Sequence, residues 1–182
     1  MASFNISSWN CRGIKASTPV TTSKTDFLEQ HFSTHPVDIL ALLETHHSNM
    51  ADLPTLFHGF NVTHHLLHTP AQAPDTYGGM VVVIDKNKFD LVDFTIYLPG
   101  RILTAVLRHI SSQEDYVFNF YYGLHPSVST SEQLRQAMHF LTQQHTDTSN
   151  SFLIGDFNFV DRAMDRPNGL NSHDYKILPL WT

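Results

Sequence analysis

The sequence is poor in cysteine and in basic residues. Its single cysteine, Cys11, excludes an internal disulfide and a cysteine-rich zinc site. Only 11 of the 182 residues are lysine or arginine, and the formal net charge is -6. These values argue against a protein that holds nucleic acid mainly through a basic surface, but they are compatible with an acidic metal site that acts on nucleic acid.

Long apolar runs are also lacking. The longest, Met80 to Ile84, is far shorter than the roughly 20 residues needed to span a bilayer. The N-terminal residues do not show the basic segment followed by an apolar one that marks a signal peptide. We therefore expect a soluble intracellular protein that does not use a membrane as partner.

Histidine, by contrast, is abundant, with 13 residues that include the neighbouring pairs His46-His47 and His64-His65. A metal centre would be favoured by two histidines at helical spacing with an acid nearby, and these neighbouring pairs do not show that helical pattern. Solvated or partly buried histidines are the expected interpretation.

The hydrophobic pattern predicts one domain over residues 1–182, with several strands and a few helices. Strands are expected at residues 4–9, 39–43, 80–84, 89–94, 102–110, 116–122 and 152–154. A helix is expected between residues 24 and 35, and another around Leu134, Ala137, Met138 and Leu141, with a capping box at Ser129-x-x-Glu132. Hairpins mixed with helices indicate an α+β or layered α/β fold rather than a regular βαβ array.

Polar side chains follow three of the predicted strands where each strand ends: Asn10, Glu44, and Asp156 with Asn158. Residues two apart on an extended chain share a face, so Asp156 and Asn158 can converge on one ligand. Oxygen ligands of this kind suit Mg²⁺, which needs only one or two carboxylates beside substrate phosphate. For each residue alone, turn formation or capping is the competing interpretation.

The order of these motifs resembles the endonuclease/exonuclease/phosphatase superfamily, and within it the apurinic-type endonuclease domain of non-LTR retrotransposons. The resemblance covers nearly the whole chain. It rests on Ser8-Trp9-Asn10-Cys11-Arg12-Gly13-Ile14, Ala41-Leu42-Leu43-Glu44-Thr45-His46, Gly78-Gly79, Asn119-Phe120-Tyr121 and Ile154-Gly155-Asp156-Phe157-Asn158.

The resemblance implies a four-layered α/β/β/α sandwich of two mixed sheets, with a phosphodiesterase site that uses Mg²⁺, or Mn²⁺ in its place. By position, Asn10 matches a hydrogen-bonding asparagine, Glu44 the metal-binding glutamate and Asp156 the aspartate that orients water, and these three are the metal-site residues. Asn158 matches the neighbouring amide. Tyr121 matches a tyrosine that contacts the phosphate, although the register with Tyr122 stays open.

Two arginines, Arg12 and Arg101, are candidate phosphate contacts by the same resemblance. Surface solvation is the expected role for either of them. The implied reaction is attack of water on a DNA phosphodiester, which leaves a 3′-hydroxyl and a 5′-phosphate. In retrotransposons such a nick primes reverse transcription, so the resemblance implies a nuclear protein fused to a reverse transcriptase.

The family's last motifs, an aspartate and a Ser-Asp-His-like segment, have no match in this sequence. Ser172-His173-Asp174 has the wrong residue order and is interpreted as a loop. We therefore expect a second sheet that lacks its final strands, and hydrolysis reduced on the order of 10²–10⁴-fold. The alternatives are another phosphatase or phosphodiesterase of the superfamily, and a non-catalytic remnant.

Overall fold

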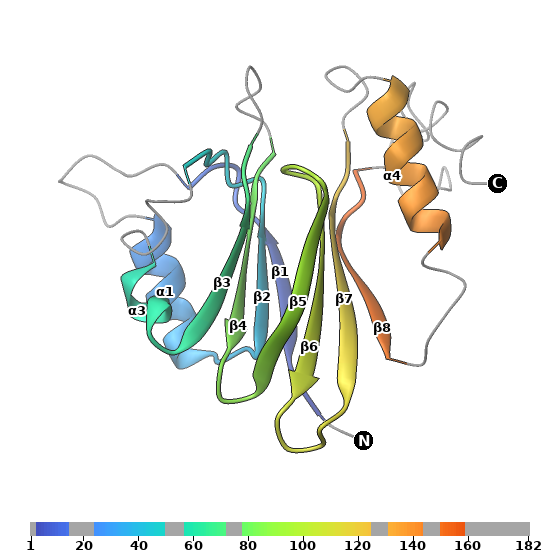
Figure 1. Ribbon diagram of the computed structural model, residues 1–182. Coiled ribbons are helices and arrows are strands. Elements are labelled where there is room, and N and C mark those ends of the chain that lie inside the picture. Colours follow the sequence, from blue (N-terminus) through green and yellow to red (C-terminus); the bar gives the residue numbers. More distant parts are fainter. Residues whose placement is uncertain are drawn as a thin grey trace, which may run out of the picture.

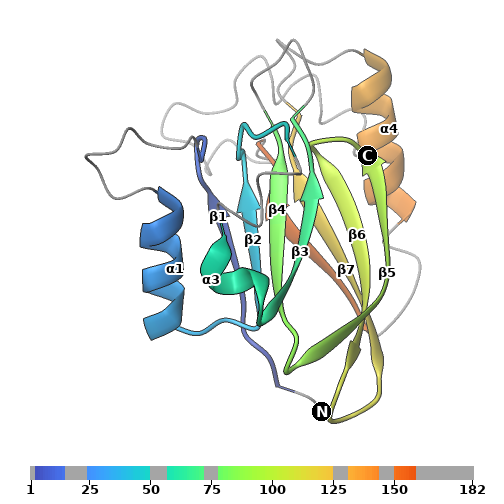
Figure 2. The same cartoon turned by 60° about the vertical axis from the view of Figure 1, so that its left-hand side comes forward.

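The computed structural model describes residues 3–14, 24–49, 57–71, 78–124, 131–143 and 150–158. These residues form two four-stranded sheets that face each other, with helices on the outer faces (Figures 1 and 2). Both sheets combine parallel and antiparallel strand pairs. The predicted layered fold with two mixed sheets is thereby confirmed.

The first sheet has the strand order β1-β2-β4-β3. Its strands are β1 (Ile6–Asn10), β2 (Ile39–Leu43), β3 (His64–Thr69) and β4 (Met80–Asp85). Only β1 and β2 run parallel, because α1 (Lys24–Thr34) lies between them in the sequence. The short α3 (His58–Asn61) leads into β3, and both helices cover the outer face of this sheet.

The second sheet has the order β5-β6-β7-β8. Its strands are β5 (Phe89–Leu98), β6 (Ile102–His109), β7 (Asp115–Tyr122) and β8 (Ser151–Asp156). Strands β7 and β8 run parallel, because α4 (Ser131–Gln143) lies between them in the sequence and packs on the outer face of the sheet.

The apolar core lies between the two sheets, and strand periodicity divides the side chains of β2 between its two faces. Ile39, Ala41 and Leu43 point into the inter-sheet core, whereas Leu40 and Leu42 point toward α1 and α3. Burial on both faces explains why this strand is an uninterrupted apolar run. As a result the residue that follows it, Glu44, is held on a rigid element.

Two elements were not predicted, α3 and β3. The segment His64–Thr69 contains three histidines and little β-branched character, so its pattern did not indicate a strand. Within it His68 is only 1% exposed, which makes it a core residue. The capping residue Ser129 and all residues from 159 on, including Ser172-His173-Asp174, lie outside the described residues.

Among the described helices, none has the length and apolar character required to traverse a bilayer.

Candidate active site

Four strand ends meet at one edge of the sandwich. In the first sheet the last residue of β1, Asn10, pairs with the last residue of β2, Leu43. In the second sheet the last residues of β7 and β8, Tyr122 and Asp156, are register partners. The two sheets are joined here, because Asn10 Nδ2 donates a hydrogen bond to Asp156 Oδ2 at 3.2 Å across 146 residues of sequence.

Glu44 lies beside this link, directly after β2. Its φ of 56° places a non-glycine residue in the left-handed region, a strained conformation that is concentrated at functional sites. Its side chain is 17% exposed, and Oε1 is 3.2 Å from His46 Nε2. The strand end therefore presents the carboxylate to the site instead of continuing the sheet.

The charge state of Glu44 is set by competing effects. Burial raises the pKa of the carboxyl, but hydrogen-bonding interactions with Asn10, Tyr122 and His46 outweigh burial, so the pKa lies below its ordinary value of 4.5. Glu44 is therefore ionised at neutral pH, as a ligand of a hard cation must be.

A glycine pair holds the Glu44 loop in place. The N–H of Thr45 donates to the carbonyl of Gly79 at 3.0 Å, and the N–H of His46 donates to that of Gly78 at 2.9 Å. Gly79 has φ 82°, and a Cβ there would lie 2.6 Å from Thr45 Oγ1. Only glycine allows this close approach, which accounts for Gly78-Gly79 in the motif order.

Asp156 and Asn158 form a turn as well as part of the site. Asp156 Oδ1 accepts the N–H of Asn158 at 3.0 Å, while Oδ2 accepts from Asn10. Asn158 has φ 56°, and its Nδ2 donates to the carbonyl of Gly123 at 2.9 Å. One oxygen of Asp156 thus stabilises the turn, and the other reaches Asn10 at the site. The turn role and the site role considered from the sequence are therefore compatible.

The two tyrosines at the end of β7 point to opposite faces. Tyr121 is 3% exposed, belongs to the apolar cluster under α4 and stacks on Phe157 at 5.2 Å. Tyr122 points to the inter-sheet side, and its hydroxyl interacts with Glu44 and Asn158. Burial and the Glu44 carboxylate raise the pKa of Tyr122 to about 12, so it stays protonated and can donate.

Arg101 departs from the expectation of surface solvation. It is only 8% exposed, its Nη1 donates to the carbonyl of Gly123 at 3.0 Å, and its guanidinium carbon lies 4.6 Å from the centroid of the Tyr122 ring. Burial lowers the pKa of its guanidinium below the ordinary value, while Tyr122 and Glu44 favour the charged form. The tertiary packing brings this cation into the site; Arg12, in contrast, is exposed as expected.

The donor set fits a hard cation. No group of three or more His, Cys, Asp or Glu side chains within the described ranges is placed to hold a metal. Glu44 and Asp156 nevertheless supply carboxylate oxygens, and the Asn10 amide oxygen, which accepts the N–H of Arg12 at 3.1 Å, keeps a second lone pair. Mg²⁺ requires no more than one or two carboxylates with substrate phosphate and water.

Comparison with known proteins places the chain in a family. A sequence profile of the Endonuclease/Exonuclease/phosphatase family matches residues 7–175. No curated protein sequence matches significantly.

Several solved structures share the fold. D. rerio TDP2 in complex with a single-strand DNA product aligns with a TM-score of 0.64 and 16% identity, covering 93% of this chain and 66% of that one. The mannosyl-6-phosphatase of Bacteroides thetaiotaomicron aligns with a TM-score of 0.62 and 12% identity, covering 99% of this chain and 70% of that one. ANGEL2, a 2′,3′-cyclic phosphatase in complex with adenosine-2′,3′-vanadate, aligns with a TM-score of 0.59 and 14% identity, covering 88% of this chain and 55% of that one.

At these identities the likeness extends to the fold alone. The chain spans 55–70% of the length of these three structures.

Proposed function

Because this chain belongs to the endonuclease/exonuclease/phosphatase family, we propose that it is a metal-dependent DNA endonuclease domain of the non-LTR retrotransposon type. Members of the family are enzymes that hydrolyse phosphate esters and phosphodiesters. The observation that carries the proposal is the hydrogen bond between Asn10 and Asp156, which joins the two sheets next to Glu44 and Tyr122. Local turn formation alone would not require this connection between distant motifs.

Each residue of the cluster has a separate role in the proposal. Asp156 orients the attacking water and accepts its proton. The hydrogen bond from Asn10 Nδ2 to Asp156 Oδ2 holds this carboxylate at the edge where the two sheets meet. Tyr122, which is protonated at neutral pH, donates to a phosphoryl oxygen. Arg101 adds a buried positive charge beside that oxygen, where the low dielectric strengthens its attraction for phosphate.

Glu44, Asp156 and Asn10 would hold a magnesium or manganese ion. Such an ion, when bound, supplies positive charge that stabilises the extra negative charge of the transition state. Asn158 supports the arrangement by fixing the turn after β8, since its backbone N–H and its amide are both engaged there.

DNA is the proposed substrate for two reasons. The motif order is most similar to that of the retrotransposon endonucleases, and one structural neighbour is a protein in complex with a single-strand DNA product. A nuclear location and a fusion to a reverse transcriptase in the full-length gene belong to the same proposal.

A substrate panel tests the proposal. Supercoiled plasmid, an inositol phosphate and mannose 6-phosphate are incubated with the chain and Mg²⁺ or Mn²⁺, in parallel with the Glu44→Gln variant. Because the family's last motif has no match in this sequence, we expect only slow conversion of plasmid to the nicked form, with 3′-hydroxyl ends, and Glu44→Gln should abolish it. Hydrolysis of a sugar or inositol phosphate without nicking would overturn the assignment to DNA.

A phosphomonoesterase is the second candidate, because the mannosyl-6-phosphatase structure covers 99% of this chain. The panel separates the two by the substrate that is consumed. Calorimetric titration with Mn²⁺ tests the alternative that the chain is a non-catalytic remnant. Mn²⁺ affinity that disappears in Glu44→Gln would support a metal site. Absence of Mn²⁺ binding by the wild-type chain would favour the remnant.

A further inference from the structure

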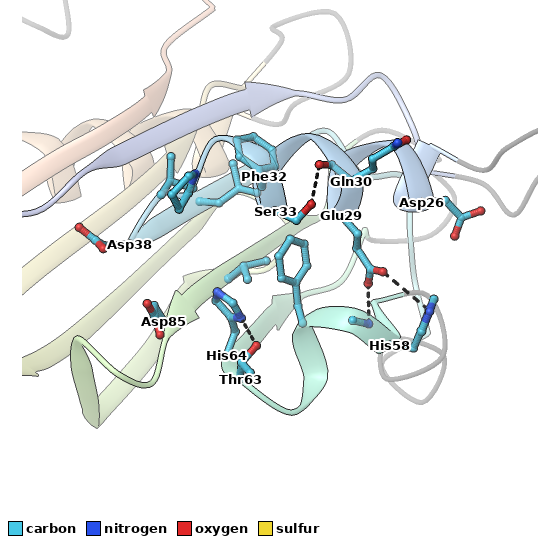
Figure 3. A pocket seen from close by; sticks show the side chains of 16 residues that line it. Asp26, Glu29, Gln30, Phe32, Ser33, Asp38, His58, Thr63, His64 and Asp85 are labelled. Atoms are coloured by element: carbon cyan, nitrogen blue, oxygen red, sulfur yellow. Dashed lines mark hydrogen bonds and ion pairs between the residues drawn. The ribbon is translucent and has the colours of Figure 1, made fainter.

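The first sheet carries a cavity that is separate from the candidate active site. It has a volume of about 660 Å³ and lies on the outer face of the sheet, between α1 and α3 (Figure 3). It is lined where β2 begins and β4 ends, at Asp38 and Asp85, whereas Asn10 and Glu44 are at the opposite end of β1 and β2. A cavity of this size matches a small organic ligand.

Part of the cavity wall is apolar. Phe32 of α1 and Phe60 of α3 contribute to its walls, and Leu40 and Val83 from the sheet also line it. All four belong to the buried cluster beneath the helices, so the cavity rests on rigid packing. Aromatic faces in this position suit an apolar body and attract a cation through the ring quadrupole.

The ionisable side chains that line the cavity are four acids and two histidines. Four carboxylates line the cavity, namely those of Asp26, Glu29, Asp38 and Asp85, and none of the lining residues is lysine or arginine. Burial is the main cause that lowers the pKa of His64 from 6.5, so this lining histidine is neutral at pH 7. A phosphate ester would be repelled here, and a cation would be attracted.

The acidic groups differ in how far they are already engaged. Glu29 Oε1 accepts the N–H of Gly59 at 2.9 Å, which ties α3 to α1 and fixes the width of the cavity. Asp38 Oδ2 accepts the N–H of Asn5 at 2.7 Å, and Asp85 Oδ1 accepts from Asn87.

The second oxygens of the two aspartates, Asp38 Oδ1 and Asp85 Oδ2, have no hydrogen-bond partner among the residues that the structure describes. Asp38 directly precedes β2 and Asp85 ends β4, and the N–H of Asp85 donates to the carbonyl of Asp38. Two carboxylate oxygens are therefore available at one end of the cavity.

We propose that this cavity binds a small amphipathic organic cation. Its apolar body packs between Phe32 and Phe60, and its ammonium or guanidinium group donates to Asp38 and Asp85. The site is distinct from the phosphoester site and does not depend on metal.

Three indole ligands with the same body and different charge test this inference: tryptamine is cationic, tryptophol neutral and indolepropionate anionic. Calorimetric titration of the 182-residue chain at low salt, without metal, should show tryptamine binding about tenfold or more tightly than tryptophol, because a charge-assisted hydrogen bond is roughly twice as strong as a neutral one and the carboxylates add Coulomb attraction. Indolepropionate should bind most weakly. Equal affinity for the three ligands, or no binding of tryptamine at millimolar concentration, would overturn the inference.

Isosteric neutralisation locates the binding site. Asp38→Asn and Asp85→Asn keep an oxygen acceptor for their turn partners, so each should fold, which a thermal melt checks. Each should lower tryptamine affinity by about tenfold and leave tryptophol affinity unchanged. Asp115→Asn, a neutralisation on the distant β7, is the matched control. Unchanged tryptamine affinity in both cavity variants would contradict the assignment.

Discussion

The two ends of the first sheet both carry carboxylates, but their surroundings differ. At the candidate active site Glu44 is surrounded by the donors Asn10, His46 and Tyr122, and the buried Arg101 lies next to them. At the opposite end, the cavity beside Asp38 and Asp85 has no basic side chain among its lining residues. The same residue type is thus surrounded by hydrogen-bond donors and a buried cation at one end, and by other carboxylates at the other.

Carboxylates alone do not define a site for phosphate chemistry. An anionic substrate is tolerated beside carboxylates only where a metal, a guanidinium or hydrogen-bond donors offset the repulsion. Arg101 and Tyr122 meet this requirement at one end of the sheet. The other end lacks both, which is why we assign it to a different ligand.

Removing one charge from the active-site end should have the largest effect. Asp156→Asn keeps an oxygen that can accept from Asn10 but loses the base, so the rate of plasmid nicking should fall on the order of 10²–10⁴-fold. Initial rates with Mg²⁺ measure this. Asp115→Asn, which neutralises an exposed carboxylate paired with Arg108, should retain the wild-type rate. Equal rates in the two variants would remove Asp156 from the proposed mechanism.

A pair of glycine substitutions compares the rigidity of the two ends. A Cβ at Gly155 would overlap the carbonyl oxygen of Tyr121 on the neighbouring strand, so Gly155→Ala should lower the free energy of unfolding by about 2–3 kcal/mol. At Gly59 the Cβ would meet the end of the flexible Glu29 side chain. Gly59→Ala should therefore change the free energy by less than about 1 kcal/mol.

Urea unfolding curves measure both glycine variants. If Gly59→Ala proved more destabilising than Gly155→Ala, the backbone contact between β7 and β8 would not be the constraint that positions Asp156.

The two tyrosines of β7 provide a matched pair at a single strand end. Tyr122→Phe removes the hydroxyl that interacts with Glu44 and Asn158, and the nicking rate should fall about tenfold through loss of one donor to the phosphate. Tyr121→Phe should leave the rate unchanged, because Tyr121 packs beneath α4. A lower nicking rate in Tyr121→Phe and an unchanged rate in Tyr122→Phe would instead assign the phosphate contact to Tyr121. The thermal melts of both variants should stay close to that of the wild type.

The smallest expected effect concerns pH. The pKa of Glu44 is lowered in the folded chain, so the unfolded state binds more protons and stability rises with pH in this range. The contribution of Glu44 is complete above 4.5, its ordinary pKa, and is lost as pH falls through the lower folded value. Unfolding free energies between pH 3 and 6 should show a shallower slope in Glu44→Gln. Identical slopes would mean that its hydrogen bonds do not favour the charged form.

The regular elements could largely be predicted from sequence, because their signals are local. The apolar run Ile39–Leu43 and the helical spacing of Ala137, Met138 and Leu141 each produced the expected element. Strand β3 could not be predicted, since its three histidines become strand residues only through pairing with β4. Its stability comes from the sheet and the buried His68, and neither is visible in the hydrophobic pattern.

Asn10, Glu44 and Asp156 can be assigned to strand ends from local information, because each lies at the end of an apolar segment that periodicity identifies. How they combine depends on tertiary contacts. Parallel pairing within each sheet aligned the strand ends, and the packing of one sheet on the other placed Asn10 against Asp156. The same packing turned Tyr122 inward and buried Arg101. Which face of a strand points to the core, and which side chains are buried, depend on contacts with residues far away in the chain.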